Sequence, residues 1–237
     1  MKIENKDLKK DFYLKLVADS VIDSADLDLA EVAVNGRDGY LYLDKERYNS
    51  VPQSFIFYLM PPKTKTLEKA YDDFNDFVSS KKANFKFTLS RDKDHYYYGF
   101  KKKGLSFQKI GHRVAKVTMI LDVYPYKFLH EGDKVITNPT SITNPTNYIA
   151  LPTIKVVPSS ANASFSIAGR RFNLVNTGVT TILINSQSKQ ITTSLGTSTM
   201  WNQVATYNFP FLDAGYNSVS KTNISTLEIT PHYRRLI

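Results

Sequence analysis

The side chains of this sequence that could do chemistry are few and scattered. Asp72 and Asp76 stand one helical turn apart, a spacing that suits acid–base catalysis, but a solvated helix face explains such a pair more often. Asp92, Asp94 and His95 carry metal-ligating atoms, yet no fourth ligand is near them in the sequence, and acidic residues are common in turns. The pattern therefore predicts neither an acid–base pair nor a metal site.

The histidines form no catalytic grouping either. They are spread along the chain without a nucleophile-elbow or metalloprotease motif: His95, His112, His130 and His232. The chain has no Cys, which removes both a disulfide framework and a thiolate metal site. We predict a protein that is not an enzyme and that uses no cofactor and no metal.

The charge of the chain is strongly positive, with 31 basic and 22 acidic residues. Such a balance can mark nucleic-acid binding, but the basic residues are dispersed and no binding motif accompanies them. The one tight run, Lys101 to Lys103, is followed by Gly104 and is typical of a solvated turn. The longest apolar run, Phe55 to Met60, is far below the roughly 18 residues of a membrane span, and Met1 to Lys10 is too polar for a signal peptide. We expect neither a membrane anchor nor an export signal.

The elements that position these side chains are predicted to be mainly β, since Tyr (15) and Phe (14) are abundant. Val114 to Val123 alternates apolar and polar residues as a half-buried strand does, and the Tyr124-Pro125-Tyr126 step is expected to stop its ladder. The composition changes beyond this corner. We therefore predict an N-terminal domain over residues 1–130, a linker over 131–152 and a C-terminal domain over 153–237.

One helix is predicted in the N-terminal domain, from about Thr66 to Ser80, because apolar residues recur there at spacings of three and four. Thr66 suits its N-cap. The same domain has four further strand candidates, over residues 12–18, 54–60, 84–90 and 95–101. The C-terminal domain has many short strand candidates and no amphipathic helix, which indicates a β-sandwich: 154–157, 164–167, 171–174, 181–184, 190–193, 203–209, 218–220 and 227–230.

A hairpin is predicted around Asn35-Gly36-Arg37-Asp38-Gly39, because Asn-Gly and Asp-Gly tolerate the positive φ of tight turns. An isolated two-stranded hairpin is marginal in water, so this one needs a partner sheet. The partner is either its own domain or another subunit, and the sequence leaves both open. As the hypothetical subunit interface we take Asn35, Gly36, Arg37, Asp38, Gly39, Tyr40, Leu41, Tyr42 and Leu43.

The order of several motifs resembles the distal tail (Dit) proteins, the ring-forming hubs of long-tailed, non-contractile bacteriophages. In the first half these are the Gly36 to Gly39 turn, the helix, the Tyr-rich stretch His95 to Gly99 and the Pro125-Tyr126-Lys127 corner. In the second half they are the stretches at residues 144–145, 152–156, 167–171, 211–217 and 227–234. The chain is similar to the short form of the family, because it has no room for inserted carbohydrate-binding modules.

This resemblance implies a structural virion protein of the siphovirus tail or baseplate. Its N-terminal domain would be a β-sandwich-like ring former with one helix, and its C-terminal domain a galectin-like β-sandwich. Six copies would close into a ring that joins the tail-tube protein to the tail-tip lysin or fibre protein and offers a platform to receptor-binding proteins. DNA would pass through the lumen without specific binding. Such a protein is made in the host cytoplasm and ends at the tail tip.

A carbohydrate-binding module is the alternative from another class. Trp201, the single Trp, is close in sequence to Tyr207, and aromatic faces stack on sugars. A single Trp in a β-sandwich is more often part of the core, and a fold does not fix a ligand.

Overall fold

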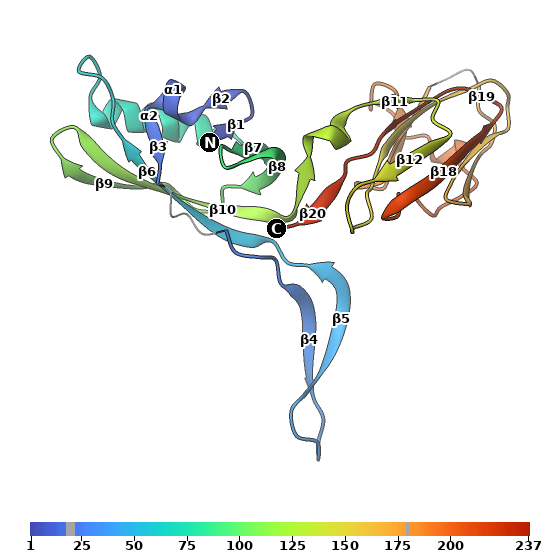
Figure 1. Ribbon diagram of the computed structural model, residues 1–237, viewed down its shortest axis with the longest axis horizontal. Coiled ribbons are helices and arrows are strands. Elements are labelled where there is room, and N and C mark those ends of the chain that lie inside the picture. The colour runs from blue at the N-terminus through green and yellow to red at the C-terminus, as the bar shows by residue number, and fades with distance from the viewer. Residues whose placement is uncertain (18–21, 179–180) are drawn as a thin grey trace. The chain divides into compact units, whose positions relative to one another are not determined.

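The computed structural model describes residues 1–17, 22–178 and 181–237, and the chain forms two compact units (Figure 1). Unit 1 consists of Met1–Lys127 with Leu236–Ile237, and unit 2 consists of Phe128–Arg235. Strands dominate the described part of both units, so the predicted mainly β fold class is confirmed. No helix in this part is long and apolar enough to cross a membrane.

One large sheet organises the described part of unit 1. Its strand order is β2-β1-β7-β8-β10-β6-β3, and β9 and β20 also pair with β10. The strands are β1 Lys2–Ile3, β2 Lys6–Asp7, β3 Leu14–Leu16, β6 Val51–Leu59, β7 Phe85–Leu89, β8 Asp92–Phe100, β9 Ser106–Gly111, β10 Val114–Leu129 and β20 Arg234–Leu236. At its centre β10 and β6 are antiparallel, from Ala115 opposite Leu59 to Val123 opposite Val51. Along both strands alternate side chains are buried, which is the pattern of a strand with one face on a core.

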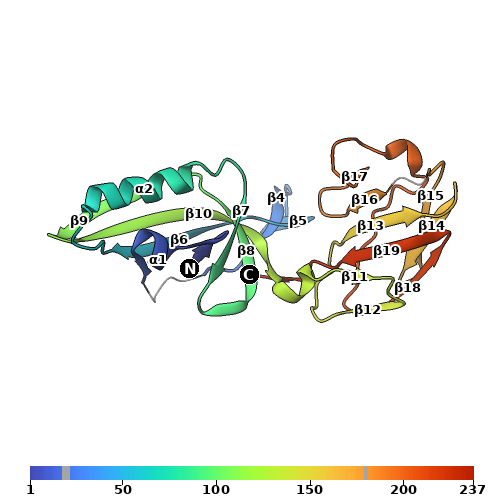
Figure 2. The same cartoon turned by 90° about the horizontal axis from the view of Figure 1, so that it is seen from above.

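The predicted helix is confirmed as α2, Leu67–Ser79, which lies along the sheet (Figure 2). The Thr66 hydroxyl accepts a hydrogen bond from the Lys69 N–H at 3.2 Å, as an N-cap does. Phe74 and Val78 are fully buried on its apolar stripe. A second helix, α1 (Leu8–Phe12), was not predicted from the sequence, because five residues are too few for a clear periodicity.

Two predicted strand limits in unit 1 are wrong. The strand expected over residues 12–18 is short, since Phe12 belongs to α1, Tyr13 ends that helix with φ 60°, and β3 covers only Leu14–Leu16; residue 18 lies outside the described residues. The strand expected to stop at Val123 continues through Pro125 as β10. Pairing with β6 does end at Val123, but the φ of proline suits an extended chain, and the Pro125 carbonyl accepts the Ile237 N–H at 3.1 Å.

Unit 2 contains two packed sheets in its described residues, which confirms the predicted sandwich. One has the order β11-β19-β13-β16-β17 and the other β12-β18-β14-β15. The strands are β11 Ile136–Thr137, β12 Ser141–Asn144, β13 Thr153–Pro158, β14 Ala163–Ile167, β15 Arg170–Leu174, β16 Ile182–Asn185, β17 Gln190–Thr193, β18 Gly215–Thr222 and β19 Ile224–Thr230. Two 3₁₀ turns accompany them, η1 (His130–Asp133) and η2 (Trp201–Gln203). A single cluster of buried apolar side chains fills the space between the sheets.

The segment predicted as a linker, residues 131–152, is instead part of unit 2. It supplies the edge strands β11 and β12, and Ile142 and Ala150 are buried in the sandwich core. Its Asn-Pro-Thr step is an ordered turn, because the Asn144 carboxamide accepts the Thr146 N–H at 3.1 Å and donates to the Tyr148 carbonyl at 2.8 Å. The strand expected over 203–209 is also absent from the structure, where only Val204 makes a bridge, to Leu174.

Candidate functional site

The predicted hairpin is confirmed as a two-stranded ribbon of β4 (Leu27–Ala33) and β5 (Tyr40–Tyr48). Gly36 and Gly39 have φ of 79° and 78°, a conformation that costs other residues steric strain. The Arg37 N–H donates to the Val34 carbonyl at 3.1 Å and tightens the turn. Every hypothetical interface residue from Asn35 to Leu43 is exposed.

The ribbon has an aliphatic face and an aromatic face. Ala30 pairs with Leu43 and Val32 with Leu41, so these four side chains share one face, while Tyr40 and Tyr42 are on the other. The exposed fractions are 38% for Val32, 38% for Leu41, 50% for Leu43, 54% for Tyr40 and 57% for Tyr42. Apolar side chains on both faces of one ribbon are unusual for a surface that stays in water.

Within the described part of unit 1, the ribbon is a sheet of its own that pairs with no strand of the large sheet. Figure 1 shows it extending away from β6 and β10. The two partners that the sequence left open, the chain's own domain and another subunit, both remain predictions, although no strand of the own domain pairs with the ribbon in the described residues. The ribbon is an arm whose backbone edges and side chains are available to another molecule.

The two strands of the ribbon are joined at its base by an ion-pair cluster. The Asp28 carboxylate accepts hydrogen bonds from Lys45 Nζ at 2.8 Å and from Arg47 Nε at 2.6 Å. The bond from Lys45 is the largest cause that lowers the pKa of Asp28, and the bond from Arg47 is the second. The Asn49 N–H donates to the Asp26 carbonyl at 2.9 Å. These contacts link β4 to β5 at the end of the ribbon opposite the turn.

The acidic residues considered for chemistry have structural roles or point to solvent. Asp72 and Asp76 are exposed on α2. Asp92 accepts hydrogen bonds from Tyr97 (2.7 Å) and Lys127 (3.0 Å) and contacts His95 Nδ1 at 2.6 Å, which joins β8 to β10. Burial opposes ionisation of this carboxyl, but the three hydrogen bonds outweigh it and lower the pKa of Asp92 to about 2.

The four histidines are divided between the two units. His95 and His112 belong to unit 1, and His130 and His232 to unit 2. Among the described residues no three His, Asp or Glu side chains are grouped as a metal site would require. The lysine run is a solvated turn between β8 and β9, as predicted, and Lys102 forms an ion pair of 2.7 Å with Asp122.

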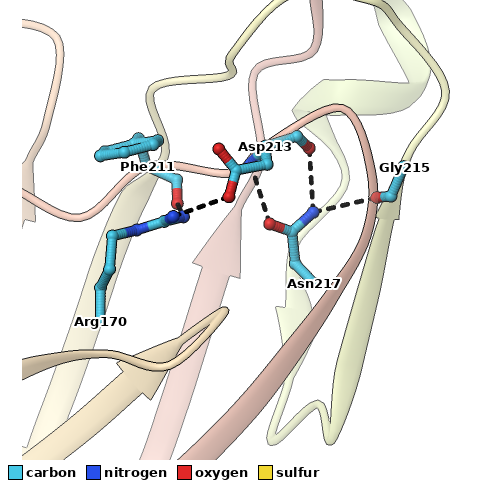
Figure 3. A network of polar contacts seen from close by, with 5 residues as sticks. All are labelled: Arg170, Phe211, Asp213, Gly215 and Asn217. Atoms are coloured by element: carbon cyan, nitrogen blue, oxygen red, sulfur yellow. Dashed lines mark hydrogen bonds and ion pairs between the residues drawn. The ribbon is translucent and has the colours of Figure 1, made fainter.

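A polar network in unit 2 joins two stretches that carry the resemblance to distal tail proteins, residues 167–171 and 211–217 (Figure 3). The Arg170 guanidinium lies 3.8 Å from the centre of the Phe211 ring and donates to the Phe211 carbonyl at 3.0 Å and to Asp213 at 2.7 Å. The fully buried Asn217 side chain accepts from the Asp213 N–H at 2.8 Å and donates to the Asp213 and Gly215 carbonyls. Arg170 and Asp213 are 43 residues apart, and the local alternation of apolar and polar residues does not predict a contact over that separation.

Trp201 is not a core residue, contrary to the commoner expectation for a single Trp. It is 39% exposed and follows β17, at the start of η2. Its ring stacks on Tyr207 with centroids 6.4 Å apart and meets Phe209 edge-on at 5.8 Å. The sequence correctly placed Trp201 near Tyr207, and the structure shows that both are at the surface.

Comparison with solved structures identifies the fold. No protein-family model matches the sequence, and no curated protein matches it. The crystal structure of SPP1 Dit, described as a paradigm of hub adsorption apparatus in Gram-positive infecting phages, has a TM-score of 0.72 at 15% identity. That likeness covers 99% of this chain and 98% of SPP1 Dit. The chain has the distal tail protein fold.

Two further structures agree with this result. The phage P2 baseplate in its activated conformation with Ca matches at a TM-score of 0.55 and 12% identity, over 98% of this chain and 93% of that one. The same baseplate with Sr matches at 0.51 and 12% identity, over 90% and 88%. The resemblance stated from the sequence motifs is thus confirmed for the fold, and the likeness includes both units.

Proposed function

We propose that this chain is the distal tail protein of a long-tailed, non-contractile phage, a structural and non-enzymatic hub. The observation that carries the proposal is the likeness to the SPP1 hub protein along nearly the whole chain. In this role six copies form a ring at the tail tip. The ring joins the tail tube to the tail-tip lysin or fibre protein and supports receptor-binding proteins, and DNA crosses its lumen without specific contacts.

The ribbon is the proposed means of ring closure. A cyclic ring needs a heterologous contact, in which one surface of a subunit meets a different surface of the next. An arm that lies on the neighbouring subunit provides such a contact and covers strand edges that otherwise invite aggregation. The proposed interface consists of residues Asn35 to Leu43.

The energetics favour burial of the ribbon in the ring. A large apolar side chain contributes about 1.5–3 kcal/mol when it passes from full exposure to full burial. Leu41, Leu43, Tyr40 and Tyr42 are each between 38% and 57% exposed, so each retains part of that gain for an interface. Burial of several such side chains on one arm offsets part of the free-energy cost of ordering the ribbon on a neighbour.

The test replaces Tyr40 to Leu43 with Gly-Ser-Gly-Ser and measures native mass and circular dichroism. We expect the unchanged chain to form rings and the variant to be a folded, soluble monomer. A matched control makes the same replacement at Ser194 to Thr197, an exposed stretch of unit 2, and should leave the rings intact.

The possible outcomes of this test distinguish the role of the ribbon in assembly from the hub role of the chain. Rings that survive the ribbon replacement would exclude the ribbon as the assembly device and leave the hub role standing. An unchanged chain that stays monomeric at every concentration, with no ring in assembled tails, would contradict the hub role itself. A ribbon variant that unfolds would show that β5 stabilises its own unit.

A further inference from the structure

Unit 2 contains a cavity that the hub role does not use. Its volume is about 700 Å³, which is within the range of about 300–1,000 Å³ that small-molecule sites occupy. Tyr207, Phe209 and Phe211 line it from the segment after η2, Arg170 from β15 and Ser186 from the end of β16. The network of Figure 3 holds Arg170 and Phe211 in place at its wall.

Aromatic rings give the cavity an apolar wall. Trp201 stacks on Tyr207 and packs edge-on against Phe209, so it supports both rings without lining the cavity itself. Tyr207 is 71% exposed, and its ring is therefore accessible to a ligand. A sugar ring has C–H faces that pack on an aromatic ring and hydroxyls that need hydrogen-bond partners, so it matches a wall that joins rings to polar groups.

Two residues that line the cavity each have an enclosed polar atom without a hydrogen-bond partner among the described residues. They are Ser186, through Oγ, and Arg170, through Nε, and the Ser186 hydroxyl meets a ligand in the cavity only when its side chain rotates toward it. An unsatisfied buried polar atom costs free energy, and native proteins rarely keep one without a ligand, an ion or water to satisfy it. Hydroxyl groups of a saccharide are donors and acceptors of the required kind.

The charge at the cavity selects among saccharides. Arg170, Arg171 and Lys189 line it, whereas the described lining residues include neither Asp nor Glu. Asp213 forms an ion pair with Arg170 at 2.7 Å, and Arg171 and Lys189 leave the lining with an excess of positive charge. We propose that this cavity binds an anionic saccharide, a sugar ring that bears a phosphate or a carboxylate. The proposal does not depend on ring formation.

Titration calorimetry of the full chain tests the site. Glucose 6-phosphate and glucuronate are the probes, and glucose and inorganic phosphate are the controls. We expect at least one probe to bind more tightly than both controls and to change the fluorescence of Trp201, the single Trp of the chain. Whichever probe binds distinguishes a phosphorylated from a carboxylated ligand.

Three variants locate the binding. Tyr207→Ala should weaken probe binding about tenfold, and Ser186→Ala roughly three- to tenfold, through loss of ring packing and of one hydrogen bond. Tyr216→Ala is the matched control, because Tyr216 is 70% exposed in the same unit and does not line the cavity. Since the Ser186 hydroxyl has no described partner, Ser186→Ala should not lower the melting temperature.

Several results would overturn the proposal. These are no binding of either probe at millimolar concentration, equal binding of glucose and the probes, inorganic phosphate binding as tightly as glucose 6-phosphate, or equal losses in Tyr207→Ala and Tyr216→Ala. None of them bears on the mass of the ring, so failure here is separate from failure of the hub role.

Discussion

At the scale of single residues, the acidic side chains show how a chemical group can serve the fold. Asp92 has carboxylate oxygens of the kind that bind metals. Here these oxygens contact three side chains instead, those of Tyr97, His95 and Lys127. Burial is the largest cause that raises the pKa of Tyr97, and the hydrogen bond to the Asp92 carboxylate raises it further. Asp92 therefore fixes one end of β8 to the far end of β10.

We predict that Asp92→Asn lowers the free energy of unfolding at pH 7 by about 1–3 kcal/mol, because it leaves the charged and polar partners without a carboxylate. The folded pKa of Asp92, about 2, is below its unfolded value. The stabilisation is thus complete above the unfolded pKa and is lost as the pH falls toward about 2. Urea unfolding at pH 7 and at acidic pH should show the two proteins converging in acid.

The control for this prediction is Asp94→Asn, a charge-equivalent change at an exposed position of the same strand. It should leave the free energy of unfolding within about 0.5 kcal/mol of the unchanged protein. Equal stability of Asp92→Asn and the unchanged protein at pH 7 would show that the hydrogen bonds to Asp92 contribute nothing net.

At the scale of elements, α2 is the main helical contribution to the core of unit 1. Phe74 is fully buried, and its ring lies 5.5 Å from that of Phe12 and 6.4 Å from that of Phe57, measured between centroids. The helix therefore joins α1 and β6 through one side chain.

We expect Phe74→Ala to destabilise the protein by about 3–5 kcal/mol, through lost transfer free energy and the cavity left behind. Asp72→Ala, on the exposed face of the same helix, should change stability by less than about 0.5 kcal/mol. Thermal and urea melts compare the two. The opposite ranking would mean that α2 packs with its other face inward.

At the level of the whole molecule, the ribbon is a two-stranded sheet that pairs with no other strand of the described residues. Its base is tied by Asp28 and its tip exposes apolar residues on both faces. In the proposed ring a second copy would cover the ribbon without a further protein, so ring formation is the most direct test of the proposed function.

The excess of basic charge leads to a prediction about the lumen. Phosphate contacts to Lys and Arg give strong, salt-dependent binding, which would impede DNA passage. We therefore expect Lys101 to Lys103 to lie off the lumen wall of the ring, and the purified ring not to retain duplex DNA at physiological salt. A structure of the assembled ring in which these three lysines line the channel would contradict this.

The local features of this protein follow from its sequence alone. The spacing of apolar residues located α2 and the alternation located β10, because burial of one face imposes those periods. The positive φ of Gly36 and Gly39 could be anticipated because few other residues adopt it. The order of motifs along the chain also indicated the correct fold.

Which segments of the chain meet could be learned only from the folded protein. The ribbon pairs with no strand of its own large sheet in the described residues, residues 131–152 join the sandwich, and Arg170 reaches Asp213. Likewise, β10 runs through Pro125, whose carbonyl accepts the N–H of Ile237. Each of these outcomes depends on hydrogen bonds and packing between residues far apart in the chain. A local pattern tells which side of a segment is buried, but it does not tell which partner buries it.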